Sequence, residues 1–290
     1  MIHYLPTVYS NRQGFECLGE LAKATEDLFA DRLELNMSQV WSFDANMAAP
    51  LGAILAQVAD KFNTVEIVAI PDEVEQVLRK NRFLTNYWYE SLNDIDRITM
   101  PFRRLRLRDE GEFEEYIHRQ LSGRGIPRMS ERASRVFKKK VFEVYQNAVV
   151  HSESELGVFV CGQFFPQQHR LDFTIADVGI GIREAVRRYF NDTRISSLPA
   201  LKWALKPYHT TKSGPHPGGL GLEFLQKFAR LNKGKIQIAS RFGFYELNCD
   251  KETFEGMAAD LPGTAVTIGI NTADEGVYVL KSEIDTDDVS

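Results

Sequence analysis

The chain has 290 residues, of which 43% are hydrophobic and 26% charged, a composition typical of globular proteins and not of disordered or fibrous ones. Its length predicts two domains, because one domain usually spans roughly 100–200 residues. The formal net charge of −5 gives no support to a protein held on nucleic acid or on an acidic membrane by bulk charge.

Membrane and secreted classes are disfavoured by three further features. The longest apolar segment, 48–59, is interrupted by a proline and a glutamine and is shorter than the roughly 20 residues of a membrane helix. The first residues lack the basic start and apolar run of a signal peptide. Cys17, Cys161 and Cys249 are too few and too far apart for a disulfide framework or a zinc site. We therefore expect a soluble protein of a reducing compartment, the cytoplasm.

The first hundred residues alternate between helical and extended patterns. Apolar residues three or four apart predict helices over 18–29, 50–62 and 72–84. Alternating or β-branched residues predict strands over 32–41 and 64–70. This order predicts an α/β layer whose strands are at least partly parallel.

The pattern changes near residue 99. Residues 99–107 look like a strand, and 109–121 like a helix with acidic residues in its first turn. The segment 122–128 contains two glycines and a proline and is the best linker candidate in the chain. We expect a first domain over 1–98, a connecting strand, helix and linker over 99–128, a second domain over 129–272 and an acidic C-terminal tail over 273–290.

The second half is predicted to contain helices over 130–151, 182–190 and 220–231, and strands over 157–165, 170–176, 235–240, 244–248 and 264–270. A long irregular stretch is expected before Gly218. Strands on one face and helices on the other make an α/β sandwich.

The helix 130–151 carries the first of four motifs that suggest chemistry. Glu143, Asn147 and His151 are four residues apart, so their side chains share one face of the helix. A carboxylate, an amide and an imidazole in such a row could hold a metal ion and a water molecule. A solvated helix face would give the same pattern, and this alternative stays open for the motif alone.

Two motifs lie at the ends of predicted strands. Asp177 follows the strand LDFTIA, and Gly179 and Gly181 come directly after it. An acceptor beside glycines allows a ligand to approach the backbone closely, although a simple glycine turn would look similar. In the last motif, Thr264 begins a strand and its hydroxyl could support a nearby acid.

The remaining motif joins a lysine to a glycine-rich helix start. Thr210, Thr211 and Lys212 precede Gly219 and Gly221, where the helix 220–231 begins. Glycines that open a helix expose backbone N–H groups to an anion, and the helix dipole adds attraction. Neither the GxGxxG pattern nor the GxxxxGK[ST] pattern is present, so the Rossmann and P-loop interpretations fail.

Together, ExxxNAxxH, DxGxG, TTK with GGLGL, and GTxVxI resemble the motifs of the GHKL ATPase superfamily, which includes gyrase and the histidine kinases. All four occur in the family's order across 130–270, each on the expected element. The resemblance implies that the second domain has the Bergerat fold, an α/β sandwich, and that the cofactors are ATP and Mg²⁺.

The resemblance also implies roles for residues at the motif positions. Asn147 would ligate Mg²⁺ through its amide oxygen, which suits the preference of magnesium for oxygen ligands. Glu143 would be the base that activates water, and Asp177 would accept a hydrogen bond from the adenine amine. The other ATP-binding residues that it implies are His151, Gly179, Gly181, Thr210, Thr211, Lys212, Gly219, Leu220, Gly221, Leu222 and Thr264.

The first domain has a resemblance of its own. Residues 33–87 are similar to a STAS domain, the antagonist fold of anti-sigma-factor systems, with a generic α/β cap as the alternative. In phosphorylated STAS proteins a serine starts the helix after the first turn. The aligned residues here are Asp44, Ala45, Asn46 and Met47, none of which carries a hydroxyl, so phosphorylation at this turn is not implied. The expected architecture is a STAS-like α/β domain followed by a Bergerat-fold α/β sandwich.

Three functions remain open. The leading expectation is a slow Mg²⁺-dependent ATPase that acts as a nucleotide-controlled switch for protein partners of the STAS-like domain. The motif ExxxNAxxH is most similar to the anti-sigma-factor serine kinases, so a serine kinase acting on a STAS-domain partner is the alternative. A non-catalytic, nucleotide-responsive scaffold is the third. The resemblance also implies a homodimer, whereas membrane or nucleic-acid partners are not expected.

Overall fold

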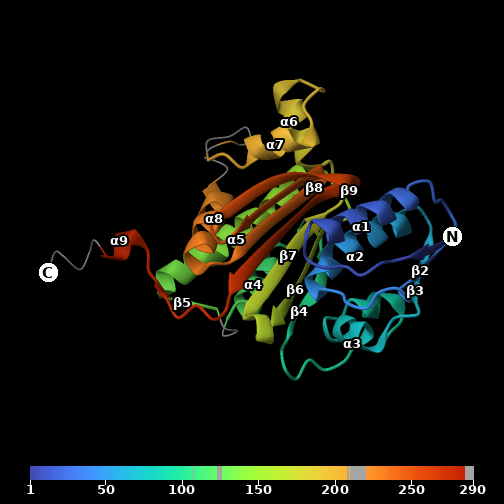
Figure 1. The fold of residues 1–290 in the computed structure, drawn as a ribbon, viewed down its shortest axis with the longest axis horizontal. Helices are drawn as coiled ribbons and strands as arrows, with labels where there is room; N and C mark the ends of the chain where they lie inside the picture. Colours follow the sequence, from blue (N-terminus) through green and yellow to red (C-terminus); the bar gives the residue numbers. More distant parts are fainter. Residues whose placement is uncertain (107, 123–125, 208, 210–219, 285–290) are drawn as a thin grey trace.

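The computed structural model describes residues 1–106, 108–122, 126–207, 209 and 220–284. Within these residues the protein is mixed α/β and contains three β-sheets (Figure 1). No helix within these ranges is long and apolar enough to cross a membrane.

The N-terminal unit is built on a sheet of three parallel strands in the order β1–β2–β3. Its elements are β1 (Ile2–Tyr4), α1 (Arg12–Ala24), β2 (Arg32–Asn36), α2 (Ala48–Asp60), β3 (Thr64–Val68) and α3 (Asp72–Lys80). The predicted parallel strands are confirmed, and the helices supply the crossovers that parallel strands need. Helix α1 begins earlier than predicted because Asn11 caps it, accepting a hydrogen bond from the Gly14 N–H at 3.0 Å.

The large sheet has five antiparallel strands in the order β4–β6–β7–β9–β8. These strands are β4 (Thr99–Leu105), β6 (Val158–Phe165), β7 (Arg170–Asp177), β8 (Lys235–Asn248) and β9 (Lys251–Asn271). The segment expected as a connection therefore supplies an edge strand of this sheet. Residues 235–240 and 244–248, predicted as two strands, are one strand whose register shifts between Ser240 and Gly243. Strand β9 starts well before the predicted residue 264, since Gly256, Pro262 and Gly263 obscure its pattern.

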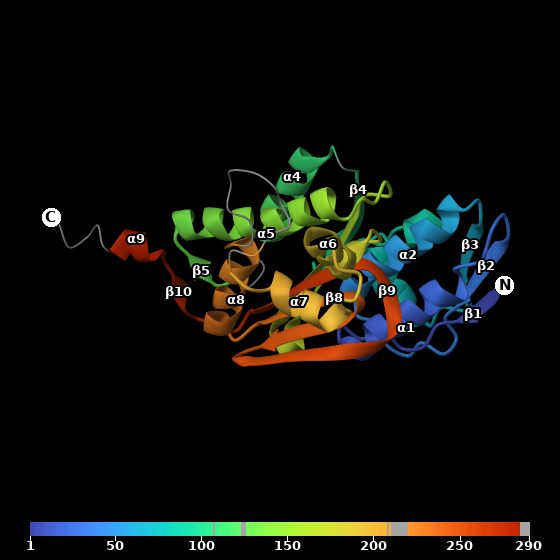
Figure 2. The same cartoon turned by 90° about the horizontal axis from the view of Figure 1, so that it is seen from above.

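Helices α4 (Glu110–Gln120), α5 (Glu131–His151) and α8 (Leu220–Asn232) belong to the hydrophobic core on one face of the large sheet. Helices α6 (Gly181–Phe190) and α7 (Ser197–Ala204) pack on each other and on β8, and Figure 2 shows them beside β8 and β9. Helix α7 lies in the stretch predicted to be irregular, which corrects that prediction.

The C-terminal tail returns to the start of α5. Strand β10 (Val277–Tyr278) pairs with β5 (Arg128–Met129), and the short α9 (Lys281–Ile284) follows. The Ser130 hydroxyl donates to Glu283 Oε2 at 2.8 Å. The acidic tail predicted over 273–290 thus supplies a short strand and a short helix within the described residues up to 284.

The other face of the large sheet is covered by the N-terminal unit. Helix α1 contacts β9, and α2 contacts β6 and β7, so both helices lie between the two sheets (Figure 1). The contact includes a polar bond at its centre, from Asn46 Nδ2 to Thr174 Oγ1 at 2.9 Å. Ala45, Asn46 and Met47 have no exposed area, so the turn before α2 is buried against the sheet. One continuous hydrophobic core thus joins residues from both halves of the chain.

Candidate functional site

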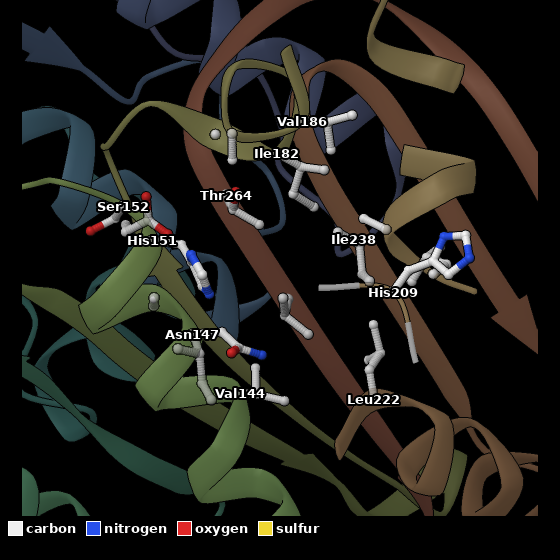
Figure 3. Close-up of a pocket in the computed structure, with 18 of the residues that line it drawn as sticks. Val144, Asn147, His151, Ser152, Ile182, Val186, His209, Leu222, Ile238 and Thr264 are labelled. Atoms are coloured by element: carbon white, nitrogen blue, oxygen red, sulfur yellow. The ribbon is translucent and has the colours of Figure 1, made fainter. Parts of the chain in front are cut away.

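A cavity of about 170 Å³ lies between α5 on one side and α6, α7 and α8 on the other, with β7, β8 and β9 as its floor (Figure 3). Its polar lining side chains are Asn147, His151, Ser152, Asp177, His209 and Thr264. Most other lining residues are apolar, among them Ile175, Ile182 and Ile238. An apolar hollow with a few converging polar groups is the usual form of a small-molecule site.

Asp177 is an almost fully buried polar group of the cavity, with 5% of its surface exposed. It ends β7 and stands opposite Thr264 of β9 in the sheet register. Its Oδ1 accepts a hydrogen bond from the Gly179 N–H at 2.8 Å, and the Thr264 backbone N–H also donates to the carboxyl group. Burial raises the pKa of Asp177 to about 7, and the two amide bonds offset part of this effect. The site therefore holds a carboxyl group that titrates near neutral pH.

Two glycines allow the backbone to close around Asp177. A Cβ on Gly179 would lie 1.8 Å from the Ser152 carbonyl oxygen, at the end of α5. That same carbonyl accepts the Ile180 N–H at 2.8 Å. Gly263 has φ +72°, and a Cβ there would lie 2.2 Å from the Asp177 carbonyl oxygen. Only glycine fits at either position without a shift of the backbone.

Helix α5 presents only part of the predicted polar row to the cavity. Asn147 and His151 line it, and Figure 3 shows both on the side opposite His209. Glu143, one turn earlier, is outside the lining and pairs with Lys140 Nζ at 2.7 Å. Its carboxylate instead reaches the first turn of α8, where a Cβ on Gly221 would lie 2.5 Å from Glu143 Oε2. The predicted row is thus split between the cavity and the N-terminus of α8.

The glycine-rich motif is only partly within the described structure. Leu222 lines the cavity, and Gly221 lies in the first turn of α8, beside Glu143. Thr210, Thr211, Lys212 and Gly219 lie outside the described residues, as does the side chain of Leu220. The structure therefore brings together the α5, Asp177 and Thr264 motifs with the start of α8.

Two aromatic residues of the cavity were given no role in the sequence-based prediction. Trp203 of α7 lines it, and its ring lies 4.8 Å from that of His209, centroid to centroid. His209 Nδ1 is buried and has no hydrogen-bond partner among the described residues, which leaves it available to a ligand. The spacing of apolar residues in 197–205 is a signal that could have revealed α7.

The side chains present fit a magnesium ion held chiefly by a phosphate ligand. Asn147 offers one amide oxygen at the cavity wall. Within the described part of the chain, no group of three or more His, Cys, Asp or Glu side chains could hold a metal ion. Mg²⁺ is commonly held by one or two protein oxygens together with phosphates and water, so a single amide ligand is compatible with it.

Asp177 is expected to make the ligand-free protein less stable as pH rises towards neutral. Its folded pKa of about 7 lies above 3.8, the ordinary value of an aspartate, so the folded state binds the extra proton between those pH values. The free energy of unfolding should then fall by about 3 kcal/mol between pH 5 and pH 8 through this group, at about 1.36 kcal/mol per pKa unit. Urea unfolding at both pH values, compared between the wild type and Asp177→Asn, measures it. If the free energy of unfolding changes equally between pH 5 and pH 8 in the two proteins, Asp177 does not have the raised pKa.

In comparisons with known proteins, no family model and no curated protein matches this chain.

Proposed function

We propose that this protein binds ATP with Mg²⁺ in the cavity beside Asp177, hydrolyses it slowly and uses the nucleotide state to change its interaction with a protein partner, as GHKL ATPases do. The observation that supports the proposal is that the predicted site residues of separate motifs lie together. Asn147 and His151, Asp177, and Thr264 come from three segments far apart in the chain, and all line one cavity. The motifs that hold these residues resemble those of the superfamily and occur in the same order.

Each part of the site has a role in this proposal. The carboxylate of Asp177 accepts a hydrogen bond from the exocyclic amine of the base, while the apolar walls exclude water. Phosphates held at the N-terminus of α8 would lie next to Glu143, since Gly221 touches its carboxylate. Bound Mg²⁺ would neutralise charge on the phosphates, and Asn147 is the residue that would ligate it. Glu143 would accept the proton of the attacking water.

The proposal extends to the architecture and the partners. The order of parallel strands and helices in the N-terminal unit supports a STAS-like domain, and the helix-covered antiparallel sheet supports a Bergerat fold. We place the protein in the cytoplasm, as a homodimer, with a protein partner on the STAS-like domain. All three cysteines are free, which agrees with a reducing compartment.

Replacing Glu143 with alanine should reduce ATP turnover by roughly 10²–10⁴-fold, the usual contribution of a general base, and leave ATP affinity almost unchanged. Phosphate release and calorimetric titration measure the two quantities. Glu131→Ala is the matched control, because Glu131 lies in the first turn of the same helix and is far from the cavity lining. If Glu143→Ala hydrolyses ATP at the wild-type rate, Glu143 is not the base.

A second candidate function is a serine kinase that acts on a separate STAS-domain protein. The fused unit itself is a poor substrate, because its turn at Ala45–Met47 has no hydroxyl and is fully buried against the large sheet. Incubation with radiolabelled ATP and candidate partners decides between the two. Label on a partner serine supports the kinase, free phosphate alone supports the ATPase, and binding without either supports a non-catalytic scaffold.

A further inference from the structure

Ser240 occupies a buried position under the floor of the cavity. It lies in β8, immediately before the register shift, and has 3% of its surface exposed. Thr264 is its partner in β9, and Ile182 of α6 lies above it. This serine belongs to none of the four motifs, yet it lies where β8, β9 and the start of α6 meet.

The hydroxyl of Ser240 makes three hydrogen-bond contacts. The Ile182 N–H donates to Ser240 Oγ at 2.9 Å. Ser240 Oγ also lies 2.8 Å from the Gly263 carbonyl oxygen and 3.0 Å from Thr264 Oγ1. Helix α6 has no side-chain hydrogen bond from its own N-cap, so this distant serine satisfies one of its free N–H groups. One hydroxyl thus connects α6, the Gly263 turn and Thr264.

The direction of these bonds follows from counting protons. A hydroxyl has one proton to donate and two lone pairs. The Gly263 carbonyl can only accept, so the Ser240 proton is used there, and the Ile182 N–H occupies one lone pair. The contact with Thr264 must then use the proton of Thr264, donated to the second lone pair of Ser240. Thr264 therefore offers only lone pairs to the cavity that it lines.

The neighbouring carboxylate of Asp177 resembles the Thr264 hydroxyl in the kind of hydrogen bond that it can make. Asp177, when ionised, also only accepts hydrogen bonds, and the backbone amides of Gly179 and Thr264 are already directed at it. We propose that Ser240 is a specificity-determining positioning residue: by fixing the Thr264 hydroxyl as an acceptor, it makes this end of the cavity select a purine nucleotide with an amino group over one with an oxo group. This inference rests on the proposed ATP site. It adds the residue that makes the Thr264 hydroxyl an acceptor and so favours nucleotides with an amino group.

Removing the Ser240 hydroxyl should free Thr264 to rotate and donate. Wild-type protein should bind ATP more tightly than inosine triphosphate, whose 6-oxo group needs a donor. In Ser240→Ala that preference should shrink by roughly fivefold to tenfold, the worth of one hydrogen bond. A purely structural role would weaken both nucleotides equally and leave their ratio unchanged.

Calorimetric titration of the whole protein with each nucleotide and Mg²⁺, at pH 8.5 to keep Asp177 ionised, measures this ratio. Ser240→Cys is the second variant, because it preserves the size of the side chain while its thiol is a weak donor and acceptor. Ser10→Ala is the matched control, because it also removes a buried, doubly bonded hydroxyl, which contacts Gln237 and Asn46 on the other face of the sheet. Ser10→Ala should leave the ratio of the ATP and inosine triphosphate affinities unchanged. In a protein that already carries Thr264→Val, adding Ser240→Ala should also leave this ratio unchanged.

The outcomes separate this inference from the proposed function. A reduced ratio in both Ser240 variants, absent in the Thr264→Val background, supports the inference. Tight ATP binding with the wild-type ratio preserved in both variants overturns it and leaves the ATP site standing. If the wild type binds neither nucleotide, the proposed site and this inference are both overturned.

Discussion

Asp177→Ala is expected to weaken ATP binding roughly 10- to 150-fold and to leave the protein folded. A hydrogen bond to a buried charged group contributes about 1.5–3 kcal/mol, and the alanine would also leave the Gly179 and Thr264 amides directed at an apolar methyl group. Titration calorimetry gives the affinity, and circular dichroism checks the fold. Both results are needed, because loss of binding in an unfolded variant says nothing about the site.

A carboxylate of the same region provides the control for Asp177. Asp192 follows α6 and pairs with Arg194 at 2.9 Å, outside the cavity lining. Asp192→Ala should bind ATP as the wild type does. Wild-type affinity in Asp177→Ala would show that the nucleotide does not use this carboxyl group.

Gly179→Ala is expected to destabilise the protein by roughly 3 kcal/mol or more and to abolish nucleotide binding. Its new Cβ would overlap the Ser152 carbonyl oxygen, 1.8 Å away, and both groups belong to the backbone. Relief of the overlap requires the Asp177 turn to move away from the end of α5. Urea unfolding measures the loss of stability.

Another glycine provides the matched control for this substitution. Gly256 lies in β9, and a Cβ there would meet no atom within 4 Å. The free energy of unfolding of Gly256→Ala should therefore lie within about 1 kcal/mol of the wild-type value. Equal stability of Gly179→Ala and Gly256→Ala would mean that the turn does not pack against α5 as described.

The centre of the site could be predicted because its residues are fixed by local pattern. A buried strand followed by an acid and two glycines placed Asp177 at a sheet end, and a second strand start placed Thr264. In the structure these two residues stand opposite each other across β7 and β9. The helical spacing of Asn147 and His151 likewise put both on one face of α5.

Tertiary contacts decided the features that local pattern missed. Glu143 shares the helix face of Asn147, but its carboxylate pairs with Lys140 and lies beside Gly221. Helical periodicity alone could not predict that Glu143 lies outside the cavity lining. Ser240 and His209 reach the site through a register shift and a connection that have no periodic signal. Their roles depend on which backbone groups surround them in three dimensions.

The packing of the two halves has a signature in the sequence of α2. Helix α2 is buried along almost its whole length, from Ala48 to Val58. A helix that is apolar on all sides must lie between two layers, which here are the N-terminal sheet and the large sheet. A Cβ on Gly52 would lie 2.6 Å from the Phe102 ring of β4, so that glycine permits the close contact between the halves.

A crystal structure of the full chain with Mg²⁺ and a non-hydrolysable ATP analogue tests the central claim most directly. The proposed site predicts the adenine ring in the cavity, with its amine at hydrogen-bond distance from Asp177 and the phosphates at the N-terminus of α8. Density for the analogue at another place, or a cavity without density at saturating analogue, would contradict the proposal that this cavity is an ATP site.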